Sequence, residues 1–176
     1  MFQNILQILT ALVAFSNKVL LFNKMRSGWV LGFLAGILSG VYFFSIDFFI
    51  YTTVQIGFSI LMLYGLFFKK LKSSIYIEPF IVIFVSMVSV VVMFFTMTGV
   101  FSFLELIASL SGLWGTFFLA RERNTLGWFL YIIMHFILTY LTFLKAQIFF
   151  SYFQLASGII AICAIVKIFI IKRKTL

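Results

Sequence analysis

The sequence predicts an all-α membrane protein with seven transmembrane helices. Of its 176 residues, 64% are hydrophobic and only 10% are charged, and the mean hydropathy is +1.23. Soluble domains carry about 25% charged residues, so this composition excludes an ordinary soluble domain. The apolar residues form continuous runs rather than the alternating, roughly 10-residue strands of a membrane β-barrel. The breaks between runs are too short for a soluble domain, which leaves one helical unit in the bilayer.

Seven apolar runs are long enough to cross a hydrocarbon core of about 30 Å, which takes roughly 20 helical residues. The predicted helices are residues 3–22, 28–45, 48–68, 79–98, 103–120, 126–144 and 147–171. The first run lacks the preceding Lys or Arg of a cleavable signal peptide and is interpreted as a retained helix. Pro79 starts the fourth run, where its missing N–H costs nothing, and Glu78 faces the positive end of that helix dipole.

The breaks that bound these helices alternate in charge. Ten of the thirteen basic residues follow the first, third or fifth helix or close the chain. They are Lys24, Arg26, Lys69, Lys70, Lys72, Arg121, Arg123, Lys172, Arg173 and Lys174. Asp47, an uncharged turn and Lys145 mark the other side. By the positive-inside rule the basic breaks are cytoplasmic, which predicts a multi-pass protein with its N-terminus outside and its C-terminus inside. The expected location is the cell membrane, specifically a bacterial inner membrane.

The second half of the chain repeats features of the first. The Gly-Trp pair at 28–29 recurs 99 residues later at 127–128, and Gln55 recurs as Gln154. The predicted division is a first triple-helix bundle at 1–68, a cytoplasmic loop and linker helix at 69–98, and a second triple-helix bundle with a basic tail at 99–176. A single linker helix gives both bundles the same orientation, and parallel repeats of this kind are a transporter architecture.

One continuous ridge of glycines runs along the second predicted helix. It consists of Gly28, Gly32, Gly36 and Gly40. Small residues four apart let membrane helices approach closely, so the ridge is predicted to be a packing surface, with room for a ligand or for sliding as the other interpretation. In the second unit the same face carries Tyr131, His135 and Thr139, again four residues apart. We expect this larger, polar column to face a ligand.

Trp128, Tyr131 and His135 place a tryptophan, a second aromatic residue three positions on and a polar residue four further in the sixth helix. This pattern resembles the helix-6 signature of the PnuC family of vitamin transporters. The stretch SGLWGTFFLARERNTLGW is similar to the family's small-residue fifth helix and Arg-rich turn, and LMLYGLFF resembles the end of its third helix. His135 stands where members more often have Asn or Asp, and a tryptophan frequent near the end of the seventh helix is missing.

The resemblance implies a SWEET-like fold of two triple-helix bundles joined by a linker helix. It also implies facilitated diffusion of a B-vitamin or nucleoside-like solute, of the nicotinamide riboside, thiamine or riboflavin class, by alternating access between the bundles. The partners would then be that small molecule and the lipid bilayer, and the sequence also permits a homo-oligomer. The alternative is a structural or assembly membrane protein with a SWEET-like shell and no transported solute.

Five residues are predicted to bind the solute: Trp114, Tyr131, His135, Gln55 and Gln154. A polar side chain in the middle of a membrane helix is costly unless it is paired, so the histidine and the two glutamines must face a cavity or a neighbouring helix. Trp114 lies deep in the fifth helix, where an aromatic ring could stack on a flat heterocycle. The other interpretation is packing, with a hydrogen-bonded core histidine and amide bonds between helices.

Other conspicuous residues are given structural interpretations. Trp29 and Trp128 begin helices and are interpreted as interfacial anchors. Lys18 and Lys167 lie near the cytoplasmic side, where long side chains can reach the headgroups. Glu105 is expected to be solvated at the outer end of its helix. None of these five residues is predicted to contact the solute.

The few titratable side chains exclude most other chemistry. Cys163 is the single cysteine, which excludes a disulfide, and one histidine cannot build a metal site. Four acidic residues offer no paired carboxylates in the membrane, and there is no nucleophile with an oriented base, so neither an enzyme nor a cofactor is expected. The net charge of +9 comes from short clusters that set membrane orientation, so nucleic acid is not expected as a partner.

Overall fold

Seven helices account for almost all of the residues that the computed structural model describes, which are 2–67, 77–96 and 99–174. They are α1 (Phe2–Phe22), α2 (Ser27–Phe44), α3 (Phe49–Phe67), α4 (Ile77–Phe95), α5 (Val100–Ala120), α6 (Asn124–Leu144) and α7 (Ile148–Lys174). Each is long and apolar enough to cross a membrane, and the described residues contain no strand. The predicted all-α fold, with seven helices long and apolar enough to span a membrane, is therefore confirmed.

The helices begin and end within three residues of the predicted positions, and the reasons for the differences are local. Gly99 has a φ angle of +77°, which only glycine adopts without strain, so α5 starts directly after it, at Val100. The seventh helix continues through the basic residues to Lys174, because cations are favourable at the negative end of a helix dipole. The basic loop predicted at Lys69, Lys70 and Lys72 lies outside the described residues.

In the described part of the chain, four helices are followed, two or three residues after their last residue, by a non-glycine residue in the left-handed conformation. These residues are Lys24, Asp47, Glu122 and Ala146. A left-handed residue after a helix turns the chain back so that the last free carbonyls are hydrogen-bonded. In the turns at Asp47 and Ala146, which are equivalent positions of the proposed repeat, the next residue donates its N–H to the carbonyl five residues back, at 2.9 Å.

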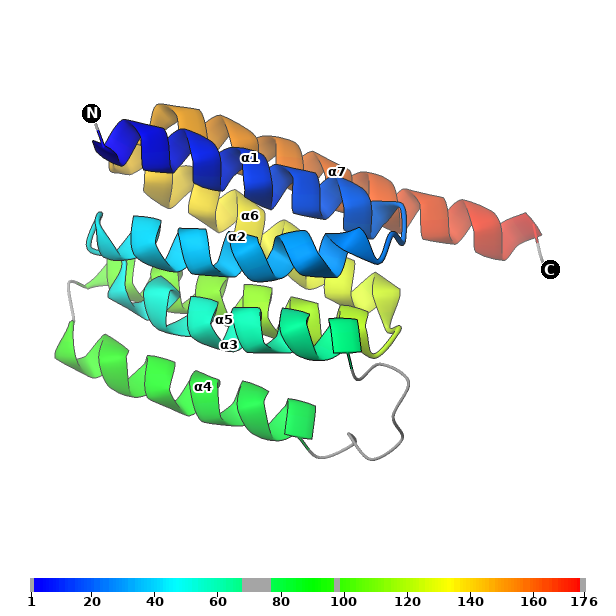
Figure 1. Cartoon of the computed structure of the whole chain (residues 1–176), viewed down its shortest axis with the longest axis horizontal. Coiled ribbons are helices and arrows are strands. Elements are labelled where there is room, and N and C mark those ends of the chain that lie inside the picture. Colours follow the sequence, from blue (N-terminus) through cyan, green and yellow to red (C-terminus); the bar gives the residue numbers. More distant parts are fainter. Residues whose placement is uncertain (1, 68–76, 97–98, 175–176) are drawn as a thin grey trace.

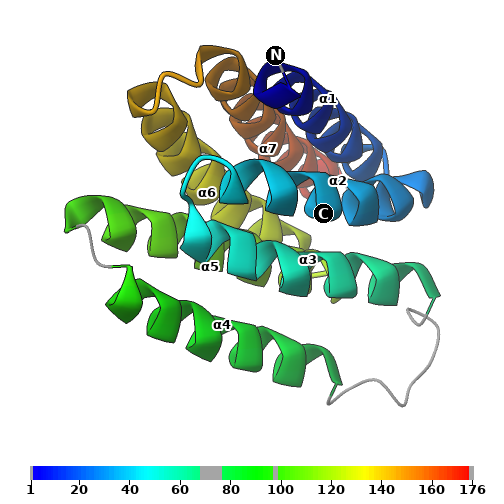
Figure 2. The ribbon, with the colours of Figure 1, turned by 60° about the vertical axis from the view of Figure 1, so that its left-hand side comes forward.

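Six of the helices form a closed ring, and the remaining helix, α4, lies outside it. The ring runs α1, α2, α3, α5, α6, α7 and returns to α1, while α4 packs against α3 and α5 on the outside (Figures 1 and 2). The first three helices form one arc of this ring and the last three form the other. Within the described residues the backbones of α1 and α3 are not neighbours, nor are those of α5 and α7, so the two arcs share one interior rather than each having its own.

The glycine ridge on α2 packs where the sequence predicts. A side chain at Gly28 would meet Leu21 of α1 at 3.0 Å, and one at Gly32 would meet Met62 of α3 at 2.6 Å. Gly36 is closer still, against Ser59 of α3. Gly40 is different, because a side chain there would have only an ordinary 3.7 Å contact. Three of the four glycines therefore hold α2 close to its neighbours in the ring.

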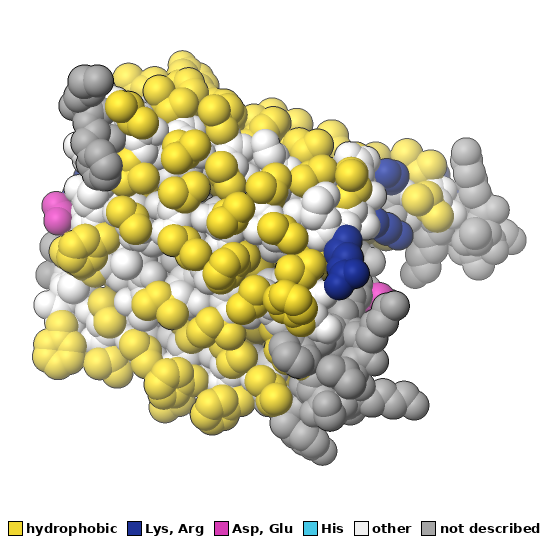
Figure 3. Space-filling model, in the orientation of Figure 1, with side chains coloured by type: hydrophobic (Ala, Val, Ile, Leu, Met, Phe, Trp, Pro, Cys, Tyr) yellow, Lys and Arg dark blue, Asp and Glu magenta, His cyan; other side chains and the backbone are white. Residues whose placement is uncertain are grey.

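The surface divides into an apolar belt and charged ends. Hydrophobic side chains cover the middle of the face in Figure 3, while the visible Lys and Arg side chains gather at the right-hand end. That end, where α1 and α5 finish and α7 terminates, carries Lys24, Arg26, Arg121, Arg123 and Arg173. We call it the basic end. The other end, which carries Asp47 and Lys145, is called the opposite end.

Candidate functional site

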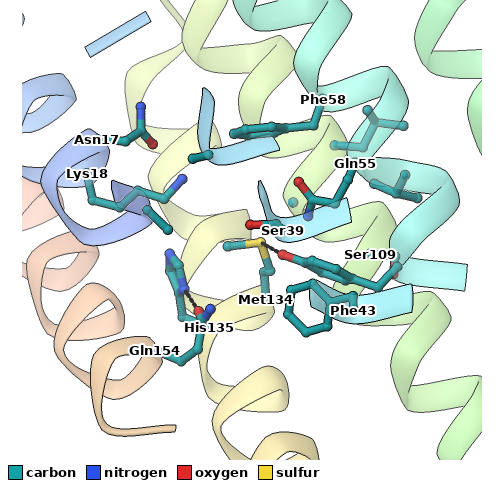
Figure 4. Close-up of a pocket in the computed structure, with 16 residues that line it drawn as sticks. Asn17, Lys18, Ser39, Phe43, Gln55, Phe58, Ser109, Met134, His135 and Gln154 are labelled. Carbon is teal, nitrogen blue, oxygen red and sulfur yellow. Dashed lines mark hydrogen bonds between the residues drawn. The ribbon is translucent and has the colours of Figure 1, made fainter. Parts of the chain in front are cut away.

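A small cavity lies inside the ring, with residues from all six ring helices around it (Figure 4). Its volume is about 40 Å³, which is enough for water but less than a drug-sized pocket of about 300–1,000 Å³. The polar residues that line it are Asn17 and Lys18 of α1, Ser39 of α2, Gln55 of α3, Ser109 of α5, His135 of α6 and Gln154 of α7. So many polar side chains at the centre of an apolar protein mark it as the candidate site.

Three of the five predicted site residues line this cavity: Gln55, His135 and Gln154. The two glutamines occupy equivalent positions of the proposed repeat and approach from α3 and α7. Tyr131 is not among the described residues that line the cavity, but its ring centre lies 3.7 Å from Nζ of Lys18, which does line it, and its hydroxyl is 2.8 Å from that of Thr116. These placements leave the predicted solute contacts as predictions, but they bring four of the five residues to one place.

Trp114 lies elsewhere. It is half-buried, it packs against Phe117 and Phe118 of its own helix, and it belongs to a cluster between α5, α3 and α4. It is not among the described residues that line the central cavity. The face of α5 that meets the cavity carries Ser109 instead. Trp114 is therefore deep in its helix, as predicted, but its side chain points away from the cavity.

His135 is held in one orientation by its neighbour on α7. Its Nδ1 is 2.6 Å from Oε1 of Gln154, and because an amide oxygen can only accept, Nδ1 carries the proton. The neutral ring then presents a lone pair at Nε2. That atom is buried and has no hydrogen-bond partner among the described residues. The predicted alternative, a fully satisfied core histidine, therefore accounts for only one of the two ring nitrogens.

The side chain of Lys18 does not extend towards the headgroups, so that prediction is wrong. Its side chain is only 5% exposed and points into the ring interior, with Nζ 3.7 Å from the ring centre of Tyr131 and 5.5 Å from that of Phe58. Among the described residues no carboxylate pairs with it. A desolvated cation–π contact contributes about 2 kcal/mol, whereas burying an ion costs several kcal/mol. The aromatic rings therefore offset only part of the cost.

Two further buried atoms that line the cavity are unpartnered within the described part of the chain. They are Oδ1 of Asn17, whose Nδ2 donates to the carbonyl of Gly28 at 2.6 Å, and Oγ of Ser109. Each unsatisfied buried group costs about 1–3 kcal/mol. No group of three His, Cys, Asp or Glu side chains among the described residues could hold a metal ion. The cavity thus offers hydrogen bonds and one amine, which carries a positive charge when it is protonated.

The sequence does indicate that Asn17 and Lys18 face the protein interior. Their position near the end of the helix suggests an interfacial location instead. Polar and small residues recur along one face of α1 at helical spacing, in the series Gln7, Thr10, Ala11, Ala14, Asn17 and Lys18. All of them lie against the ring interior or are buried. A stripe of this kind on an otherwise Leu- and Ile-rich helix indicates the face that meets other helices. Lys18 belongs to that stripe.

The opposite end of the ring is closed above the cavity by two layers. Aromatic rings with centres 4.3–5.7 Å apart form the first layer, which consists of Tyr42, Phe43, Phe48, Tyr51 and Phe150. A hydrogen-bonded group forms the second, in which Oε1 of Gln147 accepts from Gln7 at 2.7 Å and from Tyr42 at 3.0 Å. These contacts join α1, α2, α3 and α7, so this end is sealed.

Glu105 takes part in the same seal and is not solvated as predicted. It is 7% exposed, and its Oε1 accepts the backbone N–H of Tyr51 at 2.9 Å. That N–H lies in the first turn of α3, where the free donors and the helix dipole favour a carboxylate. Glu105 therefore fastens α5 to the start of α3. Its position near the end of its own helix suggested water, but the neighbouring helix end occupies that space.

The basic end contains a larger pocket of about 370 Å³. Trp29 and Trp128 both line it, together with Lys24 and Lys167. The two tryptophans were predicted to be interfacial anchors, but they are only 9% and 5% exposed. Trp29 packs against Gly65, which leaves room for the indole. The tryptophans therefore face the protein interior from equivalent positions of the two arcs.

Comparisons with known proteins return no match, either among protein-family models, among curated proteins or among solved structures. The function of this multi-pass membrane protein is therefore inferred from its own geometry. The informative features are the polar cavity inside the ring, the sealed opposite end and the pocket at the basic end.

Proposed function

We propose that the protein is a membrane transporter that moves a small polar solute through the ring by alternating access. The observation that carries this proposal is the central cavity, where three buried polar atoms have no hydrogen-bond partner and the amine of Lys18 has no carboxylate partner among the described residues. Groups of this kind destabilise a protein unless a ligand or water satisfies them. In a membrane protein they mark a solute pathway more often than a structural need.

The similarity between the two arcs supports a parallel repeat of three helices on each side of a linker helix. Every helix contact in the first arc has a counterpart in the second, and the two contacts between the arcs, α3 with α5 and α7 with α1, are also equivalent. Gln55 and Gln154 face the cavity from equivalent positions. Parallel repeats place the solute site at their interface near the middle of the membrane. A PnuC-like, SWEET-like transporter has this organisation.

The charge distribution supports an orientation with the basic end in the cytoplasm. Lys and Arg side chains near helix ends favour the cytoplasmic side, and the described ones gather at the basic end. The N-terminus then lies outside and the C-terminus inside, since the two termini are at opposite ends of the bundle in Figure 1. The opposite end, sealed by aromatic rings, faces the exterior of a bacterial inner membrane.

Alternating access follows from the two pockets. The exterior side is sealed, whereas the pocket between Trp29 and Trp128 lies at the cytoplasmic end. A vitamin- or nucleoside-sized solute does not fit in about 40 Å³, so the helices must part before it can occupy the central cavity. Parting at the basic end would join the two spaces. Release to the cytoplasm would then require no movement of the exterior seal.

Uptake into proteoliposomes tests this proposal. The panel is labelled nicotinamide riboside, thiamine, riboflavin, nucleosides and small carboxylate vitamins. We expect saturable flux for at least one of them, and loss of that flux in Gln154→Leu and Gln55→Leu. The control is Gln3→Leu, because Gln3 is exposed and lies outside the cavity. An absence of saturable flux for every member of the panel, from correctly folded protein, would refute transport of this class of solute.

A structural or assembly protein without a transported solute is the second candidate. The observation that favours it is the small size of the cavity, which two or three waters could fill. Under this interpretation His135→Ala and Gln154→Ala lower stability and no solute changes it. Thermal unfolding with the same panel separates the two, because a ligand at 100 times its Kd stabilises the folded state by about 2.7 kcal/mol.

A further inference from the structure

We infer that the solute is a monocarboxylate that also carries an O–H or N–H donor, with the carboxylate at Lys18 and the donor at Nε2 of His135. This inference rests on the proposed transport function and names the chemical class of its solute. It follows from the charge inside the cavity, from the acceptors beside that charge and from the rings that line the rest of the space.

The charge argues for a single negative group. Lys18 is the one charged side chain among the described residues that line the cavity, and it has aromatic rings rather than a carboxylate around it. A buried cation without a counter-ion is completed by an anion of equal charge. A monocarboxylate neutralises one ammonium, whereas a phosphate dianion would leave an unpaired negative charge in the membrane. Cations such as thiamine and nicotinamide riboside would meet a like charge at the same place.

The acceptors argue for a donor on the same solute. Gln154 holds Nδ1 of His135, so Nε2 can only accept, and the carbonyl of Gly28 holds Nδ2 of Asn17, so its Oδ1 can only accept. Both atoms are buried and unpartnered among the described residues. In Figure 4 Asn17, Lys18 and His135 lie on one side of the cavity. A carboxylate alone would leave the two acceptors unsatisfied, while a hydroxyl or amide N–H next to it satisfies at least one.

The remaining wall is apolar. Phe43 of α2 and Phe58 of α3 line the cavity, and Met134 of α6 completes this side with its sulfur 3.5 Å from the hydroxyl of Tyr51. In Figure 4 these side chains lie across from His135. A solute with its polar head towards α1 and α6 therefore places its carbon chain or ring against Phe43 and Phe58. The cavity thus distinguishes the two ends of the molecule.

Matched pairs of probes test the charge directly. Pantothenate carries a carboxylate with hydroxyl and amide donors, and panthenol replaces the carboxylate by a neutral alcohol. Nicotinate and nicotinamide form a second, flat pair without the donors on the acid. With the full chain in detergent, thermal stabilisation and titration calorimetry should show pantothenate binding most tightly. Each acid should bind roughly 30-fold or more tightly than its neutral analogue, which is the effect of losing one partner of a buried charge pair.

The variant Lys18→Met tests the residue. It keeps the volume and removes a buried charge, so we expect it to fold at least as well as the parent protein while the preference for acids over neutral analogues disappears. The control is Lys145→Met, which removes an exposed lysine over the ring of Phe48 at the opposite end and should leave the preference unchanged. Even if Lys18→Met did not fold, the comparison of acids with neutral analogues in the parent protein would stand.

Several results would overturn this inference, and they differ from those that refute transport. Equal binding of acids and neutral analogues, or stabilisation by chloride or inorganic phosphate without any effect of the carboxylates, would refute the solute class. Saturable uptake of riboflavin or thiamine without uptake of the acids would also refute it, while leaving the proposed transport intact. No saturable uptake of any probe would refute both.

Discussion

Alanine substitutions on the glycine ridge give a prediction that the structure makes quantitative. A Cβ atom at Gly36 would collide with Oγ of Ser59 and lie 3.1 Å from a ring carbon of Phe58. Ser59 cannot simply turn away, because its hydroxyl donates to the carbonyl of Gln55 at 2.8 Å. Helices α2 and α3 must therefore separate or that bond must break. Overpacking of this kind costs about 1–3 kcal/mol.

Gly40→Ala is the matched control on the same face of the same helix. A Cβ there meets its nearest neighbour, Gln55, at an ordinary 3.7 Å. Alanine is favoured over glycine in a helix by up to about 1 kcal/mol, so this variant should be neutral or more stable. Both variants gain the same helix propensity, so they should differ by the overpacking cost alone, about 1–3 kcal/mol in the free energy of unfolding.

The assay is reversible denaturation in mixed micelles, followed by circular dichroism and checked for equal helix content before unfolding. Adding Ser59→Gly to Gly36→Ala removes the hydroxyl that the new methyl group meets, so the double variant should recover most of the loss. Equal stability of Gly36→Ala and Gly40→Ala would show that the α2–α3 contact is not as close as the structure has it. Failure of Ser59→Gly to restore stability would show that the loss arises elsewhere.

Three further predictions concern the ends of the bundle. Glu105→Ala should lower the free energy of unfolding by about 1–3 kcal/mol, because it leaves donors unpaired at the start of α3. Glu105→Gln keeps an acceptor and should lower it less. Equal losses of stability in the two variants would contradict the proposed role of Glu105. Arg121→Met removes the 2.8 Å ion pair between Arg121 and Glu78 at the start of α4. The rate of amide hydrogen exchange should therefore rise in α4 but not in the ring helices. An unchanged exchange rate in α4 would contradict this expectation. In a Cys163→Ser background, Asp47→Cys should react with an impermeant maleimide on intact cells and Arg173→Cys only after permeabilisation; the reverse result would invert the proposed orientation.

The number and limits of the helices could be predicted from the sequence because the bilayer imposes them. Runs of apolar residues must be long enough to cross it, and charged residues must stop at its surface, so local sequence alone determines where each helix begins and ends. The glycine ridge could be recognised for a similar reason, since small residues four apart have one main use in a membrane. These features require no knowledge of which helices are neighbours.

The direction of individual side chains could not be predicted in the same way. Trp114 and Lys18 were judged by their depth in the membrane, but their surroundings depend on which face of α5 or α1 turns towards the ring. Only the arrangement of the helices decides that α5 presents Ser109 to the cavity and that Lys18 lies against Tyr131. Glu105 failed for the same reason, because the end of α3 occupies the space where water was expected.

The closure of the ring between its first and last helices affects how the protein is made. Gln7 of α1 is bonded to Gln147, which is synthesised 140 residues later, and α1 packs against α7 along this seam. At 5–20 residues per second the ribosome needs roughly 7–28 s to cover that distance. During this time the polar stripe of α1, including Asn17 and the charge of Lys18, has no ring to enter. We expect the newly synthesised α1 to remain bound to the insertion machinery, or packed against α2, until α7 emerges and the contact between α1 and α7 can form.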